Sequence, residues 1–181
     1  MNIISLLKQV AAVLAIGAFL AAPALAQSSR GPTTPDEQAR IVQLAAAADK
    51  DPVGVMTSPD GRWFEKWVDE APDYFMGPDK GVFWIATSGA AKADVKRVLR
   101  FHHTVSTAAF QLRHHIFDPQ KNEADMEAKT LAGVEGLLRA YETLVAKRAE
   151  NRTPQMDNAL ALRNSGGLAA FVKALPPMPS R

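Results

Sequence analysis

Histidine has the widest chemical range of any side chain near neutral pH, and all four copies in this chain fall within one short stretch. They form two adjacent pairs, His102-His103 and His114-His115. A neutral imidazole binds metal ions, a protonated one holds anions, and either form moves protons in catalysis. The stretch from Asp94 to Asp118 therefore holds the first candidates for function.

The apolar residues of this stretch have the spacing of an amphipathic α-helix. At about 100° per residue, one group of them falls on a face about 100° wide. That group is Val98, Phe101, Val105, Ala108, Ala109, Leu112 and Ile116. The opposite face carries Lys92, Lys96, Arg100, His103 and His114. We expect this basic face to be solvated, because charged side chains are rarely buried without partners.

The spacing of the histidines excludes a metal site made by this helix alone. His103 and His114 share a rotation but lie about 16 Å apart along the axis, whereas bonds to a metal ion are about 2 Å long. The two members of each pair point about 100° apart, and the chelating i,i+3 and i,i+4 spacings do not occur among the histidines. A metal ion would need ligands from a second element.

The segment after Asp118-Pro119 offers such ligands. Proline disfavours helix in the residue before it, so the chain should reverse there and begin a long helix over about 119–150. Leu131 to Val145 form the apolar stripe of that helix, and Glu123 and Glu127 continue its rotation toward the first helix. A tight helical hairpin would bring these carboxylates beside the second histidine pair.

The sequence therefore predicts a nitrogen and oxygen site for a divalent metal ion, the one cofactor it suggests. The predicted ligands are His114, His115, Asp118, Glu123 and Glu127. A salt bridge between His114 and Glu127 is the alternative explanation of the same residues. Non-covalent haem, with a histidine and Met126 as axial ligands, is a further alternative, although ordinary packing explains a methionine more simply.

A second hypothesis rests on charge. Its predicted ligand-binding residues are Lys96, Arg100, His102 and His103, beside Arg97 on the same broad face. If the histidines are protonated near pH 6, this face could hold an anionic small molecule, a lipid headgroup or an acidic protein surface. Nucleic acid is not expected for an exported protein, and the formal net charge, +2 for the whole chain and one less once Lys8 is removed with the signal peptide, is too small to favour it.

An enzyme is the alternative to a binding or accessory protein. His114 with Glu127 or Asp118 could act as an acid–base pair. The sequence contains no Gly-rich phosphate loop, no Gly-x-Ser-x-Gly elbow and no His-Glu-x-x-His motif, and a nucleophile with its oxyanion site is not evident. We therefore assign no catalytic residues.

The N-terminus has the pattern of a signal peptide over residues 1–26. Lys8 is followed by an apolar run from Val10 to Leu20, which is short for a membrane span, and by the small-x-small sequence Ala24-Leu25-Ala26. The mature chain should begin at Gln27 and lie in the periplasm or outside the cell, with no transmembrane segment. The absence of cysteine excludes disulfides, thiolate chemistry and covalent haem.

The rest of the chain predicts one helical domain over residues 34–175. It follows a loose linker at 27–33 and precedes a disordered tail at 176–181. Thr34, Pro35 and Glu37 form a helix start that should run to Ala48. Trp63, Phe64, Trp67 and Val68 have helical spacing and should be core.

The fold class expected from these segments is mainly α, an antiparallel helical bundle with a small β-hairpin. The hairpin is predicted from two apolar segments, Tyr74–Met76 and Val82–Ile85, around a five-residue turn. Later helices should begin at Thr153-Pro154 and hold Leu168 to Leu175. The sequence thus indicates an exported helical protein that binds a divalent metal ion or an anionic partner.

Overall fold

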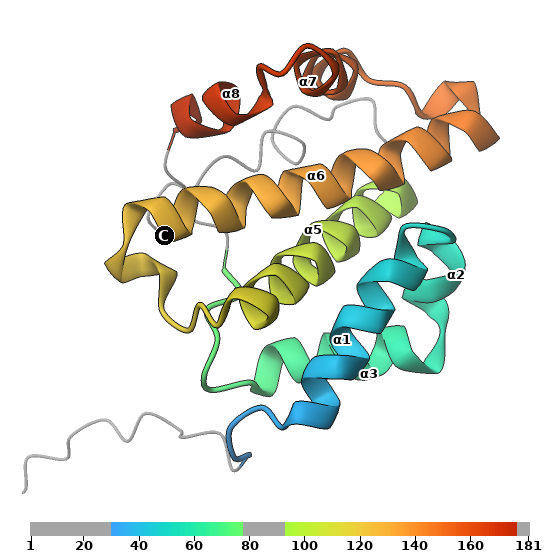
Figure 1. Ribbon diagram of the computed structural model, residues 1–181. Helices are drawn as coiled ribbons and strands as arrows, with labels where there is room; N and C mark the ends of the chain where they lie inside the picture. The colour runs from blue at the N-terminus through green and yellow to red at the C-terminus, as the bar shows by residue number, and fades with distance from the viewer. Residues whose placement is uncertain (1–29, 78–92, 177–181) are drawn as a thin grey trace, which may run out of the picture.

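The computed structural model describes residues 30–77 and 93–176, and helices make up most of both ranges (Figure 1). In chain order the elements are α1 (Pro35–Ala48), α2 (Pro52–Thr57), α3 (Pro59–Glu70), α5 (Ala93–His114), η1 (Pro119–Lys121), α6 (Glu123–Lys147), η2 (Ala149–Asn151), α7 (Pro154–Asn164) and α8 (Leu168–Ala174). The predicted mainly α bundle is confirmed. None of the described helices has the length and apolar character that a membrane span requires.

Several predicted segments lie wholly or mainly outside the described residues. They are the signal peptide at 1–26, the second hairpin segment at Val82–Ile85, the side chain of Lys92 and the tail at 176–181. The first hairpin segment, Tyr74–Met76, is described and is not a strand, and neither described range contains a strand. The predicted β-hairpin is therefore not supported.

Helix α5 lies at the centre of the bundle (Figure 1). It packs most extensively on α6, which runs antiparallel to it, while α1 and α2 contact its other side. Helices α7 and α8 cover the far side of α6. Both long helices are thus contacted from two directions, which determines the surroundings of every candidate site residue.

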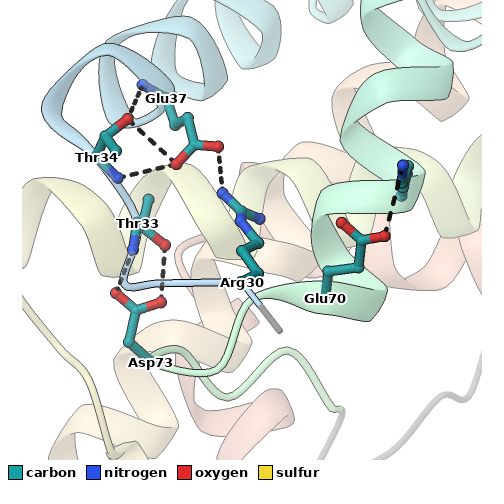
Figure 2. Close-up of polar contacts among 7 residues, drawn as sticks. Arg30, Thr33, Thr34, Glu37, Glu70 and Asp73 are labelled. Carbon is teal, nitrogen blue, oxygen red and sulfur yellow. Dashed lines mark hydrogen bonds and ion pairs between the residues drawn. The ribbon is translucent and has the colours of Figure 1, made fainter. Parts of the chain in front are cut away.

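The start of α1 confirms the predicted capping box. The Thr34 hydroxyl accepts the Glu37 amide at 3.3 Å, and the Glu37 carboxylate accepts the Thr34 amide at 2.9 Å (Figure 2). Glu37 also pairs with Arg30, and the amide and hydroxyl of Thr33 both donate to the Asp73 carboxylate. The described end of the expected loose linker is therefore fixed to α1 and to the segment after α3.

The predicted aromatic core is also confirmed. Phe64 and Trp67 are buried with their rings stacked 5.9 Å apart, and Phe101 of α5 meets Phe64 edge-on at 5.7 Å. Trp63 lies at the margin of this core, with the guanidinium of Arg40 only 3.9 Å from its ring centroid. These contacts join α3 to α5, because fully buried aromatic rings contribute strongly to packing.

The hairpin between α5 and α6 has a different turn from the one expected. Pro119 begins the short 3-10 turn η1, and Asp118 makes no side-chain capping hydrogen bond. Asn122 caps α6 instead, by accepting the Ala124 amide at 3.0 Å. The prediction that the long helix begins at Pro119 was wrong, because the turn uses η1 before regular helix starts at Glu123.

Candidate functional site

The second histidine pair lies at the exposed end of α5. His114 is the last residue of that helix, and its ring packs on Phe110 with centroids 4.4 Å apart. His115 follows in the left-handed conformation, with φ of 54°. Ile116 then donates its amide to the Gln111 carbonyl at 3.0 Å, which completes a Schellman-type helix end. These contacts give the pair a local structural role.

Lysines, rather than histidines, lie beside the acidic residues of the predicted metal cluster. Asp118 is 2.9 Å from Lys121, and Glu127 is 3.1 Å from Lys173 of α8. The hydrogen bond to Glu127 raises the pKa of Lys173, and the charge of exposed Glu123 adds to that effect. Glu127 faces α8 because α6 packs against both α5 and α8.

The metal cluster predicted from the sequence is consequently not seen. Within residues 30–77 and 93–176, no three His, Asp or Glu side chains lie close enough together to hold a metal ion. The alternative salt bridge from His114 to Glu127 is replaced by the one from Lys173. The helical period of α6 predicts the direction of the Glu127 side chain around the helix axis. It does not predict that Lys173 of α8 is the residue that side chain meets.

The first histidine pair is buried, and its assignment to a solvated ligand-binding face was wrong. His102 is fully buried, and His103 retains 9% of its surface. Burial lowers the pKa of His102, and burial together with the nearby Lys129 charge lowers the pKa of His103 to about 4. Of the other predicted ligand residues, Arg100 is exposed and Lys96 is partly buried. The four therefore do not form one surface.

A polar seam lies between α5 and α6 at the level of the first histidine pair. We use this name for His103, Ser106 and Thr107 of α5 with Lys129, Gly133 and Gly136 of α6. An added Cβ on Gly133 would lie 2.7 Å from His103 Nε2, and one on Gly136 would lie 1.8 Å from Ser106 Oγ. The two glycines therefore allow close approach of the helices.

Lys129 of the seam and Gln111 of α5 hold the segment that follows α3. Lys129 is 2% exposed, donates to the Gly77 carbonyl at 2.7 Å and lies 4.2 Å from the Phe75 ring centroid. Gln111 donates to the Phe75 carbonyl at 3.0 Å. A buried ammonium is costly unless it is hydrogen-bonded. These contacts therefore fix the segment after α3 to the helical hairpin of α5 and α6. We assign the seam a structural role.

A pocket of about 580 Å³ lies at the opposite end of the helical hairpin from the predicted cluster. It forms where α2, the first turns of α5, the end of α6 and η2 meet. Its lining is Val53, Met56, Asp94, Val95, Arg97, Val98, Leu144, Lys147, Arg148 and Asn151. We call it the α2–α5–α6 pocket. Small-molecule sites in proteins commonly have volumes of about 300–1,000 Å³, so its size suits a ligand.

The pocket has an apolar floor and a charged rim. Met56, Val95, Val98 and Leu144 are buried, while Val53 is 39% exposed at its edge. Asn151 is buried and donates to the Leu144 carbonyl at 3.0 Å, which holds η2 against the end of α6. The charged lining residues are Asp94, Arg97, Lys147 and Arg148. This arrangement favours a ligand with both an apolar and a polar part.

Sequence reasoning included Arg97 in the predicted basic face but missed the pocket. Two signals were present: the short apolar segment Val53–Met56, and the basic pair Lys147-Arg148 at the end of the long helix. Neither signal indicates a site alone, because the pocket requires that α2 and the two ends of the hairpin meet in space.

Comparison with known proteins adds no functional information: no family model, no curated protein and no solved structure matches this chain.

Proposed function

We propose that this chain is an exported helical protein that binds a small molecule in the α2–α5–α6 pocket. The observation that carries the proposal is the pocket itself, which combines a suitable volume with an apolar floor and polar groups at its rim. Ligand sites in helical bundles commonly lie between helices in this way. Export is supported by the sequence pattern of residues 1–26, with Lys8, an apolar run and Ala24-Leu25-Ala26.

The proposal does not include a metal ion or a catalytic pair. The metal hypothesis needed His114 or His115 near Glu127, Glu123 or Asp118, and the catalytic hypothesis needed His114 near Glu127 or Asp118. Within the described residues no three such side chains lie close enough to hold a metal ion, and Glu127 and Asp118 lie beside Lys173 and Lys121 instead. Addition of Zn²⁺ is therefore expected to leave the melting temperature unchanged, since a ligand stabilises a protein only by binding its folded state.

Titration with a neutral apolar fluorophore, N-phenyl-1-naphthylamine, tests the proposal. Fluorescence should rise to saturation with one binding site per chain. Val53→Trp places a large ring at the edge of the pocket without changing the buried core, because Val53 is already partly exposed. This variant should bind the probe roughly tenfold more weakly, a change of about 1.4 kcal/mol.

The matched control is Ala46→Trp, which adds the same ring at an exposed position of α1 outside the pocket lining. Its affinity for the probe should equal that of the parent protein. Melting curves of both variants establish that each is folded. Absence of saturable binding, or equal affinity in Val53→Trp and the parent, would rule out the pocket as the binding site.

A further inference from the structure

We propose that the ligand of this pocket is an apolar molecule that ends in one anionic group, such as a carboxylate. The inference rests on the proposed function, because it names the class of molecule that the α2–α5–α6 pocket accepts. It is carried by the charges of the rim. Among the lining residues that the structure describes, three cations, Arg97 of α5, Lys147 of α6 and the α6 C-cap residue Arg148, surround the apolar floor together with one acid, Asp94.

The helix dipole can explain the basic residues at the end of α6, but it cannot explain Arg97. Lys147 and Arg148 stand at the C-terminal end of α6, where the helix dipole favours cations without any ligand. Arg97 is in the second turn of α5, where the dipole gives a cation no support, and it still faces the same pocket. Charges from both helices thus converge on one space.

The existing partners of these cations are weakly held. Arg97 is 3.9 Å from Glu65 and Lys147 is 3.8 Å from Asp51, and all four side chains are at least 46% exposed. Exposed ion pairs of this length add little to stability and exchange readily. Arg148 forms no ion pair with any residue in the described ranges. A ligand anion can therefore recruit these cations at low cost to the fold.

Asp94, the acid among the described rim residues, is engaged with its own helix. Asp94 accepts the Val95 amide at 3.0 Å in the first turn of α5. Arginine side chains bind carboxylates through two parallel hydrogen bonds, which gives Arg97 and Arg148 the geometry that an anionic headgroup needs. The buried floor then accommodates the apolar part of the same molecule.

Displacement of N-phenyl-1-naphthylamine by three molecules with the same dodecyl chain tests the inference. They are dodecanoate, dodecan-1-ol and dodecyltrimethylammonium, each used below its micelle concentration. Dodecanoate should displace the probe at roughly tenfold lower concentration than the alcohol, and the cation should be weakest. The preference for dodecanoate should shrink as salt is added, since salt screens exposed charges.

Variants then assign the preference to the rim. Arg97→Gln and Arg148→Gln should each weaken dodecanoate binding several-fold and leave the alcohol unchanged, whereas Asp94→Asn should strengthen dodecanoate binding. The control is Arg100→Gln, which removes an exposed cation from the same helix outside the pocket lining. It should change neither ligand.

The outcomes distinguish the preference for an anionic ligand from the binding of any ligand in the α2–α5–α6 pocket. Equal binding of dodecanoate and dodecan-1-ol, or tightest binding of the cation, overturns the inference and leaves the pocket as a binding site. Failure of all three to displace a bound probe also overturns it. If the probe itself does not bind, the inference and the proposed function both fail.

Discussion

The two histidine pairs, one within α5 and one at its C-terminal end, have the same sequence and opposite surroundings. His102 is fully buried, with Nε2 3.4 Å from the Pro52 carbonyl oxygen, and His103 lies in the polar seam. His114 and His115 are exposed, at the point where α5 ends. The difference arises from what flanks the helix at each level.

Helix α5 is covered from two directions along its middle. Helices α1 and α2 contact one side and α6 contacts the other (Figure 1). His102, His103, Ser106 and Thr107 are therefore buried, although Arg100 of the same stretch remains exposed. At its C-terminal end, the chain turns away through His115. A residue's depth in this bundle therefore depends on its position along the helix axis as well as on its rotation.

The largest expected effect concerns acidification. The pKa of His103 is lowered to about 4 from 6.5, so the folded protein favours the neutral ring while the unfolded chain takes up a proton. Stability should be fully present above pH 6.5 and fall as the pH drops toward 4, by up to about 3 kcal/mol. Burial lowers the pKa of His102, which adds to the loss in the same direction although the hydrogen bond to Pro52 and the charge of Asp49 oppose it.

Urea unfolding between pH 4 and 7.5 measures this loss. His103→Gln removes the titrating ring, so the free energy of unfolding should vary less with pH over that range. The double variant His114→Gln/His115→Gln is the control, because both rings are exposed in the folded protein. It should keep the pH dependence of the parent, and an equal flattening in both variants would contradict the distinction between the pairs.

The second effect, somewhat smaller, concerns the approach of the helices that buries the first pair. Gly136→Ala would place a Cβ 2.4 Å from Ser106 Cβ and 3.2 Å from the His102 carbonyl oxygen, so the two helices must move apart. Overpacking of this kind costs about 1–3 kcal/mol, and the better helix propensity of alanine offsets up to about 1 kcal/mol. We expect a net loss of about 1–2 kcal/mol in the free energy of unfolding.

Two further variants identify the cause of that loss. Ser106→Gly in the same chain removes the atoms that the new methyl group meets, so the double variant should recover part of the stability beyond additivity. Gly31→Ala is the control, because an added Cβ there has no neighbour within 4 Å. A harmless Gly136→Ala would mean that the helices do not need this close approach.

The same contrast explains what the sequence could predict. Helix starts depend on neighbouring residues, so Thr34, Pro35 and Glu37 were enough to locate α1, and Thr153-Pro154 located α7. The apolar stripe of α5 was also correct from Val98 to Leu112, because a periodic pattern reflects one local geometry. Local chemistry therefore predicted most of the described helices.

The site depended on contacts that no local pattern contains. Burial of His102 requires α2 to lie on α5, and the partner of Glu127 is Lys173, far along the chain on α8. The α2–α5–α6 pocket likewise needs the first turns of α5 beside the end of α6. A helical pattern gives the rotation of a side chain, but the neighbour it meets is decided by tertiary packing.

The smallest expected effect concerns the exposed pair and has the opposite sign. His115 has φ of 54° in the helix end that Ile116 and Gln111 complete. A left-handed conformation costs a residue with a Cβ about 1–2 kcal/mol, whereas glycine adopts it freely. His115→Gly should therefore stabilise the protein by up to about 1 kcal/mol after the greater freedom of glycine in the unfolded chain is included. The melting temperature should rise by roughly 2–4 °C.

His114→Gly is the matched control one residue earlier, where the backbone is helical and glycine should destabilise by up to about 1 kcal/mol. Opposite signs for these adjacent substitutions would establish that His115 serves the helix end through its backbone conformation, while equal signs would contradict that role.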